Sequence, residues 1–267
     1  SPDLDIVTYT LAGRVDDEKG YGIEGDSFAV VETLAAHGHE SWFRLGDRDL
    51  GPCLHRTIRL GEGIGLAAVS EEIRRNLGVA TRILPMSEDP CPTFVELSGN
   101  RRAHFEEYLV RDGAPDQVTA VDLSAAAAAA PAPGVLEALE TASAILICPS
   151  NPVVSIGPIL EVPGIREAVS ARRASVVAIS PIVGGAPVKG PADRLLRGVG
   201  VEVSARGVAG LYRDLCDGYV LDERDAEQAR DVEALGMRSA VLDTLMRDAE
   251  VAARVADAAL ALARQSG

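Results

Sequence analysis

The stretch "ASAILICPSNPVVSIGPILEVPGIREAV" (residues 142–169) decides the fold, because it joins a short apolar run to a long loop and then to a helical pattern. The run "ASAILIC" is β-rich and is bounded by turn residues, which is typical of a buried strand. The prolines and glycines that follow delay the helix until "PGIREAV". A strand and a helix are usually joined by about two to six residues. This loop is long for that purpose, so we predict that it binds a ligand.

The alternation of strand and helix continues toward the C-terminus. Two further apolar runs, "ASVVAIS" (174–180) and "GYVLDE" (218–223), predict strands. Helical spacing marks "PADRLLRGVG", "DAEQARDVEALGM" and "RDAEVAARVADAALALARQ". Strands that alternate with helices form right-handed βαβ units. We therefore predict an α/β fold with a doubly wound, Rossmann-like and mainly parallel sheet in a three-layer αβα arrangement.

The first half of the chain is less regular. The segments "DSFAVVETLAAHGH" (26–39) and "GLAAVSEEIRRNLG" (65–78) predict helices. The segment "TFVELSGNRRAHFEEYLV" (93–110) predicts a hairpin that turns at Gly99 and Asn100. We interpret residues 1–267 as a single α/β domain, with a mixed helical and hairpin insertion over approximately 20–112 and the regular core over 113–267.

Composition limits the possible partners. Forty acidic residues against 26 basic ones give a formal charge of −14, which disfavours nucleic acid and anionic membranes. No apolar run reaches the length of about 18 residues that a transmembrane helix needs. The four cysteines are scattered, without the spacing of a zinc site or a disulfide framework. We expect a cytoplasmic protein that acts on small molecules.

Three loops would lie at the carboxyl edge of the predicted sheet, where open α/β sheets bind ligands, and the third is "SPDLD" at the start of the chain. The first, after "ASAILIC", offers polar side chains and an open backbone at Ser150, Asn151, Ser155 and Gly157. The second, "SPIVGGAPVKGP" (180–191), offers glycines for close approach to an oxyanion and one cation, namely Gly184, Gly185, Gly190 and Lys189. The alternative is that both loops only punctuate the structure.

Two charged stretches are further candidates. In "SPDLD" (1–5), Asp3 and Asp5 would alternate along one side of an extended segment and could converge on Mg²⁺. A solvated turn with an aspartate helix cap explains the same residues equally well. The stretch "RLGDRDL" (44–50) groups Arg44 and Arg48 with two aspartates, and its alternative is a surface salt-bridge cluster.

Taken together, "SPDLD", "YGIEGDSF", "LGDRDL", "ILPMSEDP", "PSNPVVSIGPIL" and "SPIVGGAPVKGPADRLL" resemble the 2-phospho-L-lactate transferase family of coenzyme F-420 biosynthesis. The likeness continues through "GVEVSARGVAGLYRD" and "LDERD", over nearly the whole chain. The resemblance implies transfer of a phospholactyl or phosphoenolpyruvyl group from a guanosine diphosphate-linked donor to a hydroxyl of the deazaflavin Fo. GMP is released and Mg²⁺ is the implied cofactor. The choice between the two donors stays open.

The resemblance also assigns roles to residues of this chain. Asp3 and Asp5 match the catalytic and metal-binding aspartates, and Asp5 with Arg44 matches the contacts to Fo. The positions that match the nucleotide loop are Ser150, Asn151, Pro152, Ser155 and Gly157. Those that match the second, phosphate-binding loop are Pro181, Gly184 and residues 187–191, which include Lys189. The implied assembly is a homodimer.

The sequence departs from the family pattern at its start. Family members begin with a strand, a glycine-rich loop and an Asn/Asp motif before "PDLD", so we expect an N-terminal segment with that strand to precede Ser1. Two other functions compete. A distant regulatory relative binds a nucleotide sugar without transferase activity, and a nicotinamide-dependent enzyme could share the doubly wound sheet. "SPDLD" and "RLGDRD" favour the transferase, since a regulator has no need of an acceptor site.

Overall fold

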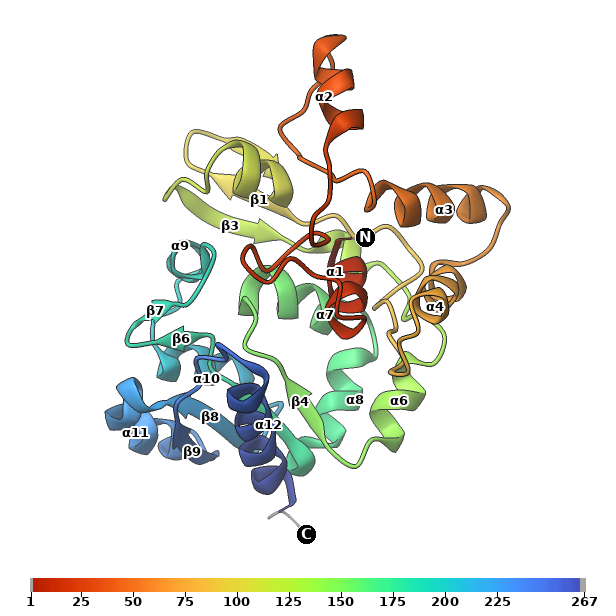
Figure 1. Cartoon of the computed structure of the whole chain (residues 1–267). Helices are drawn as coiled ribbons and strands as arrows, with labels where there is room; N and C mark the ends of the chain where they lie inside the picture. Colours follow the sequence, from red (N-terminus) through yellow and green to blue (C-terminus); the bar gives the residue numbers. More distant parts are fainter. Residues whose placement is uncertain (1, 265–267) are drawn as a thin grey trace. The chain divides into compact units, whose positions relative to one another are not determined.

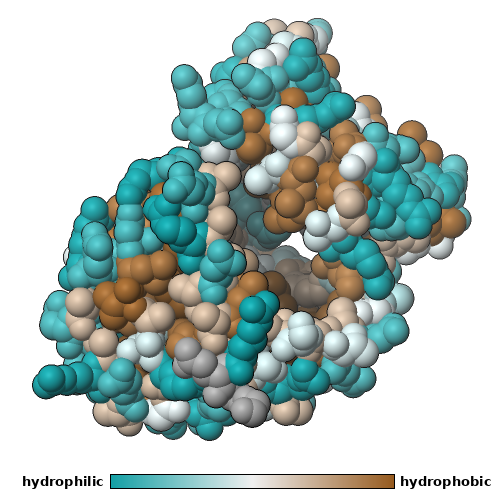
Figure 2. Space-filling view, turned by 60° about the horizontal axis from the view of Figure 1, so that its bottom comes forward, coloured by the Kyte–Doolittle hydropathy of each residue, from teal (hydrophilic) through white to brown (hydrophobic). Residues whose placement is uncertain are grey.

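The computed structural model describes residues 2–264, and its contacts divide the chain into two compact units. Unit 1 comprises Ser1–Glu88 with Ala132–Val135, and unit 2 comprises Asp89–Pro131 with Leu136–Gly267. Over the described residues, every helix is too short or too polar to cross a membrane. The face drawn in Figure 2 is largely hydrophilic, with separate hydrophobic patches.

Unit 1 is built from helices, coloured red to orange in Figure 1. They are α1 (Pro2–Leu11), α2 (Ala29–Ala36), α3 (Leu50–Gly61) and α4 (Leu66–Asn76). The helices predicted within 26–39 and 65–78 are thereby confirmed. Helix α4 packs against α3, and its N-terminal amides at Leu66 and Ala67 donate to the carboxylate of Glu88. A carboxylate at this end satisfies amides that have no partner within the helix.

One sheet of unit 2 is antiparallel, with strand order β2–β1–β3. It contains β1 (Phe94–Leu97), β2 (Arg101–His104) and β3 (Val118–Asp122). Gly99 and Asn100 connect β1 to β2 with φ angles of 76° and 57°. Two successive positive φ angles are what a tight hairpin turn requires, and the predicted hairpin is confirmed.

The second sheet of unit 2 is parallel, with strand order β4–β5–β8–β9. Its strands are β4 (Ile145–Ile147), β5 (Val176–Ile179), β8 (Gly218–Asp222) and β9 (Arg238–Leu242). Helices flank this sheet, so the predicted α/β class is confirmed. Three strands match the predicted apolar runs, whereas β9 was not predicted. Its residues, "RSAVL", are only partly buried and form no continuous apolar run.

The remaining elements of unit 2 connect or cover the strands. They are η1 (Glu107–Arg111), α5 (Ser124–Ala127), α6 (Val135–Thr141), η2 (Pro152–Ile156), α7 (Gly157–Glu161), α8 (Ile165–Ala171), η3 (Arg173–Ser175), β6 (Ile182–Val183), β7 (Ala186–Pro187), α9 (Ala192–Gly198), α10 (Ala205–Tyr212), η4 (Glu223–Gln228), α11 (Ala229–Ala234) and α12 (Ala249–Arg264).

Helix α12 lies across one face of the parallel sheet (Figure 1). Val177 and Val220 of the sheet are buried in one cluster with Val255 and Leu262 of the helix. A Cβ atom on Gly218 would lie 2.7 Å from Val177 Cγ2 and 3.4 Å from Leu262 Cβ. The glycine therefore lets helix and sheet approach closely. This core fixes the strands whose carboxyl ends carry the candidate loops.

Candidate functional site

The two loops singled out in the sequence both leave carboxyl ends of the parallel sheet in unit 2. The segment after β4 contains Asn151, and the segment after β5 contains the hairpin β6–β7. Because β4 and β5 are neighbouring parallel strands, their carboxyl ends meet at the same edge of the sheet. The expected placement of both loops is confirmed.

The loop after β4 is shaped by Asn151. Its Oδ1 accepts hydrogen bonds from the amides of Val153 (2.9 Å) and Val154 (3.3 Å) and so caps η2. Pro152 at the first helical position is compatible with this start, because proline has no amide to be satisfied. The expectation that helix formation waits until "PGIREAV" was wrong, since η2 and α7 fill the segment.

The other predicted residues of this loop differ in exposure. Ser150 is half-buried and Ser155 is exposed, whereas Pro152 is buried. A Cβ atom on Gly157 would lie 3.1 Å from the carbonyl oxygen of Pro152, so the glycine serves close packing there. Ser150 and Ser155 thus remain the members of the loop whose hydroxyls a ligand could reach.

The loop after β5 turns at two glycines. Gly184 and Gly185 have φ angles of 60° and 76° between β6 and β7. Their amides donate to the carboxylate of Asp225, at 2.7 Å and 3.2 Å respectively. The sequence predicted that these glycines approach an oxyanion, and in the structure that oxyanion belongs to the chain itself. Pro181 is buried and Lys189 is exposed.

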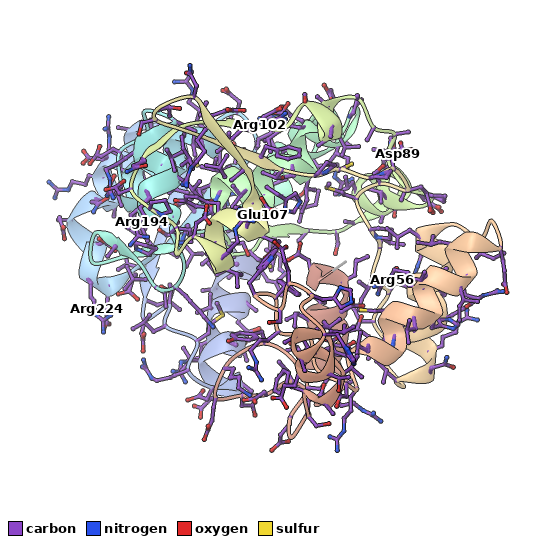
Figure 3. The ribbon with its side chains drawn as sticks, turned by 90° about the horizontal axis from the view of Figure 1, so that it is seen from above. Arg56, Asp89, Arg102, Glu107, Arg194 and Arg224 are labelled. Carbon is purple, nitrogen blue, oxygen red and sulfur yellow. The ribbon has the colours of Figure 1, made fainter. Side chains whose placement is uncertain are left out.

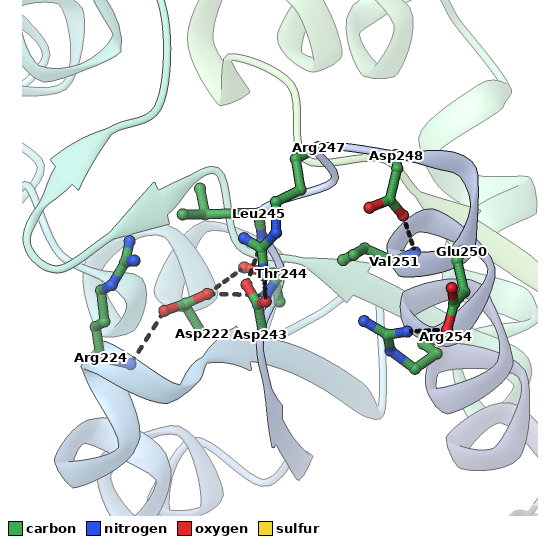
Figure 4. A network of polar contacts seen from close by, with 10 residues as sticks. All are labelled: Asp222, Arg224, Asp243, Thr244, Leu245, Arg247, Asp248, Glu250, Val251 and Arg254. Carbon is green, nitrogen blue, oxygen red and sulfur yellow. Dashed lines mark hydrogen bonds and ion pairs between the residues drawn. The ribbon is translucent and has the colours of Figure 1, made fainter.

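A polar network follows β8 and β9 at the same edge of the sheet (Figure 4). Asp222 accepts hydrogen bonds from the amide of Thr244 (2.8 Å), from its hydroxyl (3.0 Å) and from the amide of Arg224 (3.0 Å). Burial opposes ionisation, but these donors outweigh it and hold the pKa of Asp222 below its ordinary value. Asp222 is therefore a fixed anion that joins the two strand ends.

The stretch "SPDLD" was expected to form a loop, but Asp3 and Asp5 lie on helix α1 of unit 1 instead of an extended segment. With about 3.6 residues per turn, side chains two positions apart point to different sides of a helix. Asp3 is exposed, whereas Asp5 is 5% exposed. The expectation that the two carboxylates converge was wrong, because it assumed the alternation of a strand.

Asp5 belongs to a buried polar cluster between α1 and α3. Both of its oxygens accept from the guanidinium of Arg56, with an Nη1–Oδ2 distance of 3.0 Å. Next to this pair, the Tyr9 hydroxyl donates to Asp49 Oδ1 over 2.7 Å. Burial raises the pKa of Tyr9, of Asp49 and of the Cys53 thiol. Arg56 is labelled in Figure 3.

The same cluster tests whether a metal ion fits. Ligand atoms of Asp5, Asp49 and Cys53 lie within 4.8 Å of one another. Mg²⁺, however, prefers oxygen ligands and near-octahedral geometry, and a thiol is not among its ligands. The Asp5 oxygens already bind the Arg56 guanidinium. These residues do not fit a Mg²⁺ ion, and Asp3 and Asp5 do not form a metal-binding pair.

Arg44 is held on the surface of unit 1. Its guanidinium carbon lies 4.7 Å from the ring centre of Phe28, and its Nη2 lies 3.2 Å from Glu32 Oε1. The neighbouring Asp47 accepts from the amides of Ala29 (2.9 Å) and Val30 (3.0 Å) at the start of α2. Hydrogen bonds from the Val30 amide and the Ser27 hydroxyl lower the pKa of Asp47. Asp47 thus anchors the stretch "RLGDRDL" by capping helix α2, and not by a salt bridge as the alternative interpretation expected.

Several residues and contacts of these sites were not predicted from the sequence. Arg56 and Tyr9 lie next to Asp5 and Asp49, and Asp225 binds the glycine turn. Asp49 belongs to the candidate stretch "RLGDRDL" and Asp225 to the quoted stretch "LDERD", but neither stretch indicated these contacts. Pairings over 40 and more residues follow from the fold and not from local spacing.

Fold and site together define an α/β protein with polar loops at the carboxyl edge of a parallel sheet, joined to a helical unit with a buried ion pair. The chain belongs to the family described as 2-phospho-L-lactate transferase CofD, whose model matches residues 1–259.

Curated relatives cover almost the whole chain. It is 47% identical to "Phosphoenolpyruvate transferase" of Kitasatospora aureofaciens, over 99% of this chain and 84% of the relative. It is 45% identical to the protein of the same name from Thermobifida fusca, over 98% and 81%. Identity to "2-phospho-L-lactate transferase" of Methanosarcina mazei is 40%, over 96% and 84%.

A solved structure shares the fold. Protein BH3568 from Bacillus halodurans superposes with a TM-score of 0.59 at 20% identity, over 97% of this chain and 85% of that protein.

Proposed function

We propose that this protein transfers a phosphoenolpyruvyl group from a guanosine diphosphate-linked donor to a hydroxyl of the deazaflavin Fo and releases GMP. The observation that carries the proposal is the match to the transferase family over residues 1–259. The preference for phosphoenolpyruvate over phospholactate rests on identities of 47% and 40% to relatives of those two names. A cytoplasmic location and a homodimer stay predictions.

The reaction is a displacement at phosphorus. The Fo hydroxyl oxygen forms a bond to the phosphorus that carries the enolpyruvyl group, the phosphoanhydride bond to GMP breaks, and the hydroxyl proton is released. Such a transfer depends chiefly on positioning and on neutralising the phosphate charge. The chain has a net charge of −14, so cationic and neutral donors must be supplied locally. We assign this task to Lys189 and to the hydroxyls of Ser150 and Ser155.

In this proposal Arg44 and Asp5 bind the acceptor. Arg44 is exposed and could stack on or hydrogen-bond to a planar ligand while Phe28 and Glu32 hold its guanidinium. The assignment of Asp5 rests on its place in the stretch "SPDLD" and on the family match over residues 1–259. In this proposal Asp5, held in place by Arg56, orients the acceptor hydroxyl by accepting its hydrogen bond.

Magnesium remains part of the proposed reaction as an ion brought with the donor phosphates, since Mg²⁺ is commonly bound through substrate phosphates. Because the aspartates do not fit the ion as a pair, we assign it no protein ligands and no step.

A binding and competition experiment tests the proposal. Titration of the protein with Fo, followed by deazaflavin fluorescence, should give saturable binding that Arg44→Ala weakens. A conservative exchange of an exposed residue on the same unit, Lys19→Arg, should leave the titration unchanged. With Fo and equal amounts of the two guanosine diphosphate-linked donors, mass spectrometry should find the phosphoenolpyruvyl product in excess. Absence of Fo binding would exclude the acceptor, and an excess of the phospholactyl product would reverse the donor assignment.

A further inference from the structure

The turn between β6 and β7 is held by a carboxylate from a distant part of the chain. Asp225 Oδ2 accepts from the Gly184 amide over 2.7 Å, and Oδ1 accepts from the Gly185 amide over 3.2 Å. Asp225 is 2% exposed. Both glycines have positive φ angles, so their two amides can point toward one acceptor.

Asp225 is also held from its other side. The side-chain amide of Gln228 donates to Asp225 Oδ1 over 3.2 Å, while its carbonyl oxygen accepts from the Arg206 amide over 3.0 Å. The carboxylate thus has three donors, and the contact continues to the first turn of α10. Asp222 fixes the start of the same segment through the amide of Arg224 (Figure 4). The position of Asp225 is therefore determined by contacts on several elements.

This arrangement decides what the glycine amides can bind. A phosphate oxygen and the Asp225 carboxylate are both anions that need the same N–H donors, so they exclude each other at this turn. Losing both glycine amides would leave the buried Asp225 charge with only one of its three donors, the Gln228 side chain, which is strongly unfavourable. The amides of Gly184 and Gly185 therefore stay bound to Asp225, and a diphosphate must be held by other groups of the loop.

We propose that Asp225 is a positioning residue that fixes residues 180–191 so that Lys189 faces the diphosphate of the donor. The inference rests on the proposed transferase function, and it adds a residue that does not itself touch the substrate. The glycine turn acts as a rigid support and not as the phosphate cradle. Removing the Asp225 carboxylate should therefore weaken donor binding. If Asp225 instead competed with the donor phosphate for the glycine amides, its removal would strengthen donor binding.

The structural part is tested by amide hydrogen exchange. In the wild-type protein the Gly184 and Gly185 amides should exchange slowly. Asp225→Asn should accelerate both, because the new amide group offers a single acceptor oxygen in place of two. The matched control is Asp122→Asn, which changes a carboxylate that accepts from the Ser124 amide and from the Arg102 guanidinium, outside the segments that hold this turn. Fast exchange of both glycines in the wild-type protein would overturn the inference.

The functional part separates donor from acceptor. Asp225→Asn should raise the donor KM about tenfold to a hundredfold, the range for loss of charge-assisted hydrogen bonds. The KM for Fo should change by less than about threefold in the same variant, which general misfolding would not produce. If Asp225→Asn folds poorly, Gln228→Ala removes one of the three donors and should raise the donor KM in the same direction to a smaller extent.

The outcomes distinguish the inference from the function on which it rests. An unchanged or lower donor KM in Asp225→Asn, with normal wild-type turnover, overturns the positioning role alone. Wild-type protein that neither binds donor nor transfers its group overturns the proposed function and the role of Asp225 with it.

Discussion

Replacing Asp5 by asparagine should destabilise unit 1 because of the ion pair with Arg56. The two residues are 5% and 7% exposed, and the guanidinium donates to both carboxylate oxygens. Breaking such a buried pair from one side costs about 3–5 kcal/mol, since the remaining charge loses its partner. Asparagine keeps one acceptor oxygen, so we expect a loss of about 3 kcal/mol. Urea unfolding followed by circular dichroism measures it.

Two further variants separate stability from function. Asp3→Asn changes an exposed carboxylate on the same helix and should alter stability by less than about 0.5 kcal/mol. The double replacement Asp5→Leu with Arg56→Met removes both charges and should recover stability to within about 2 kcal/mol of the wild type. It should nevertheless remain inactive, because Asp5 is proposed to bind the acceptor. Wild-type stability of Asp5→Asn would refute the buried pair, and normal transfer by the double variant would refute the role of Asp5.

Three other perturbations have expected outcomes. Asn151→Ala should lose about 1 kcal/mol of stability, because its two capping hydrogen bonds are lost. Asn151→Asp keeps the cap. A loss of nucleotide affinity in Asn151→Asp at an unchanged melting temperature would therefore assign the side-chain amide of Asn151 to the ligand. Gly218→Ala should destabilise the protein by about 1–3 kcal/mol, because the new methyl group meets Val177. Gly210→Ala, in the open interior of α10, should stabilise it by up to about 1 kcal/mol. Melting temperatures that change in the same direction in both variants would contradict this packing. The lowered pKa of Asp222 means that its stabilising contribution is present above its unfolded value of 3.8 and is lost as the pH falls through the lower folded value. The stability difference between wild type and Asp222→Asn should thus shrink below about pH 4 in unfolding curves, and a difference that grows on acidification would contradict it.

The sequence predicted elements whose signal is local. The strands β4, β5 and β8 are short apolar runs, and the hairpin turns at residues that tolerate positive φ. Strand β9 was not predicted, because it is an edge strand with partly buried side chains. Its assignment depends on pairing with β8, which no local pattern reports.

The site was predictable as a set of loops but not as a set of contacts. The loops after β4 and β5 follow from the rule for parallel sheets. In contrast, the glycine amides bind Asp225 from 41 and 40 residues away, and Asp5 binds Arg56 from 51 residues away. Asp3 and Asp5 were placed on one side because an extended segment was assumed where α1 forms. The glycine amides therefore bind a carboxylate of the chain where an external oxyanion was expected. Asp3 and Asp5 do not converge on a metal ion, because helix α1 separates their side chains.

The most direct test of the proposed transfer is the dependence of GMP release on Fo. The purified protein is mixed with Mg²⁺ and the donor in which a diphosphate links the enolpyruvyl group to guanosine, and GMP and the deazaflavin product are quantified together as Fo is increased. We predict one GMP for each phosphoenolpyruvyl-Fo formed and no GMP without Fo. GMP release that is independent of Fo, or its absence with both donors, would contradict the proposed function.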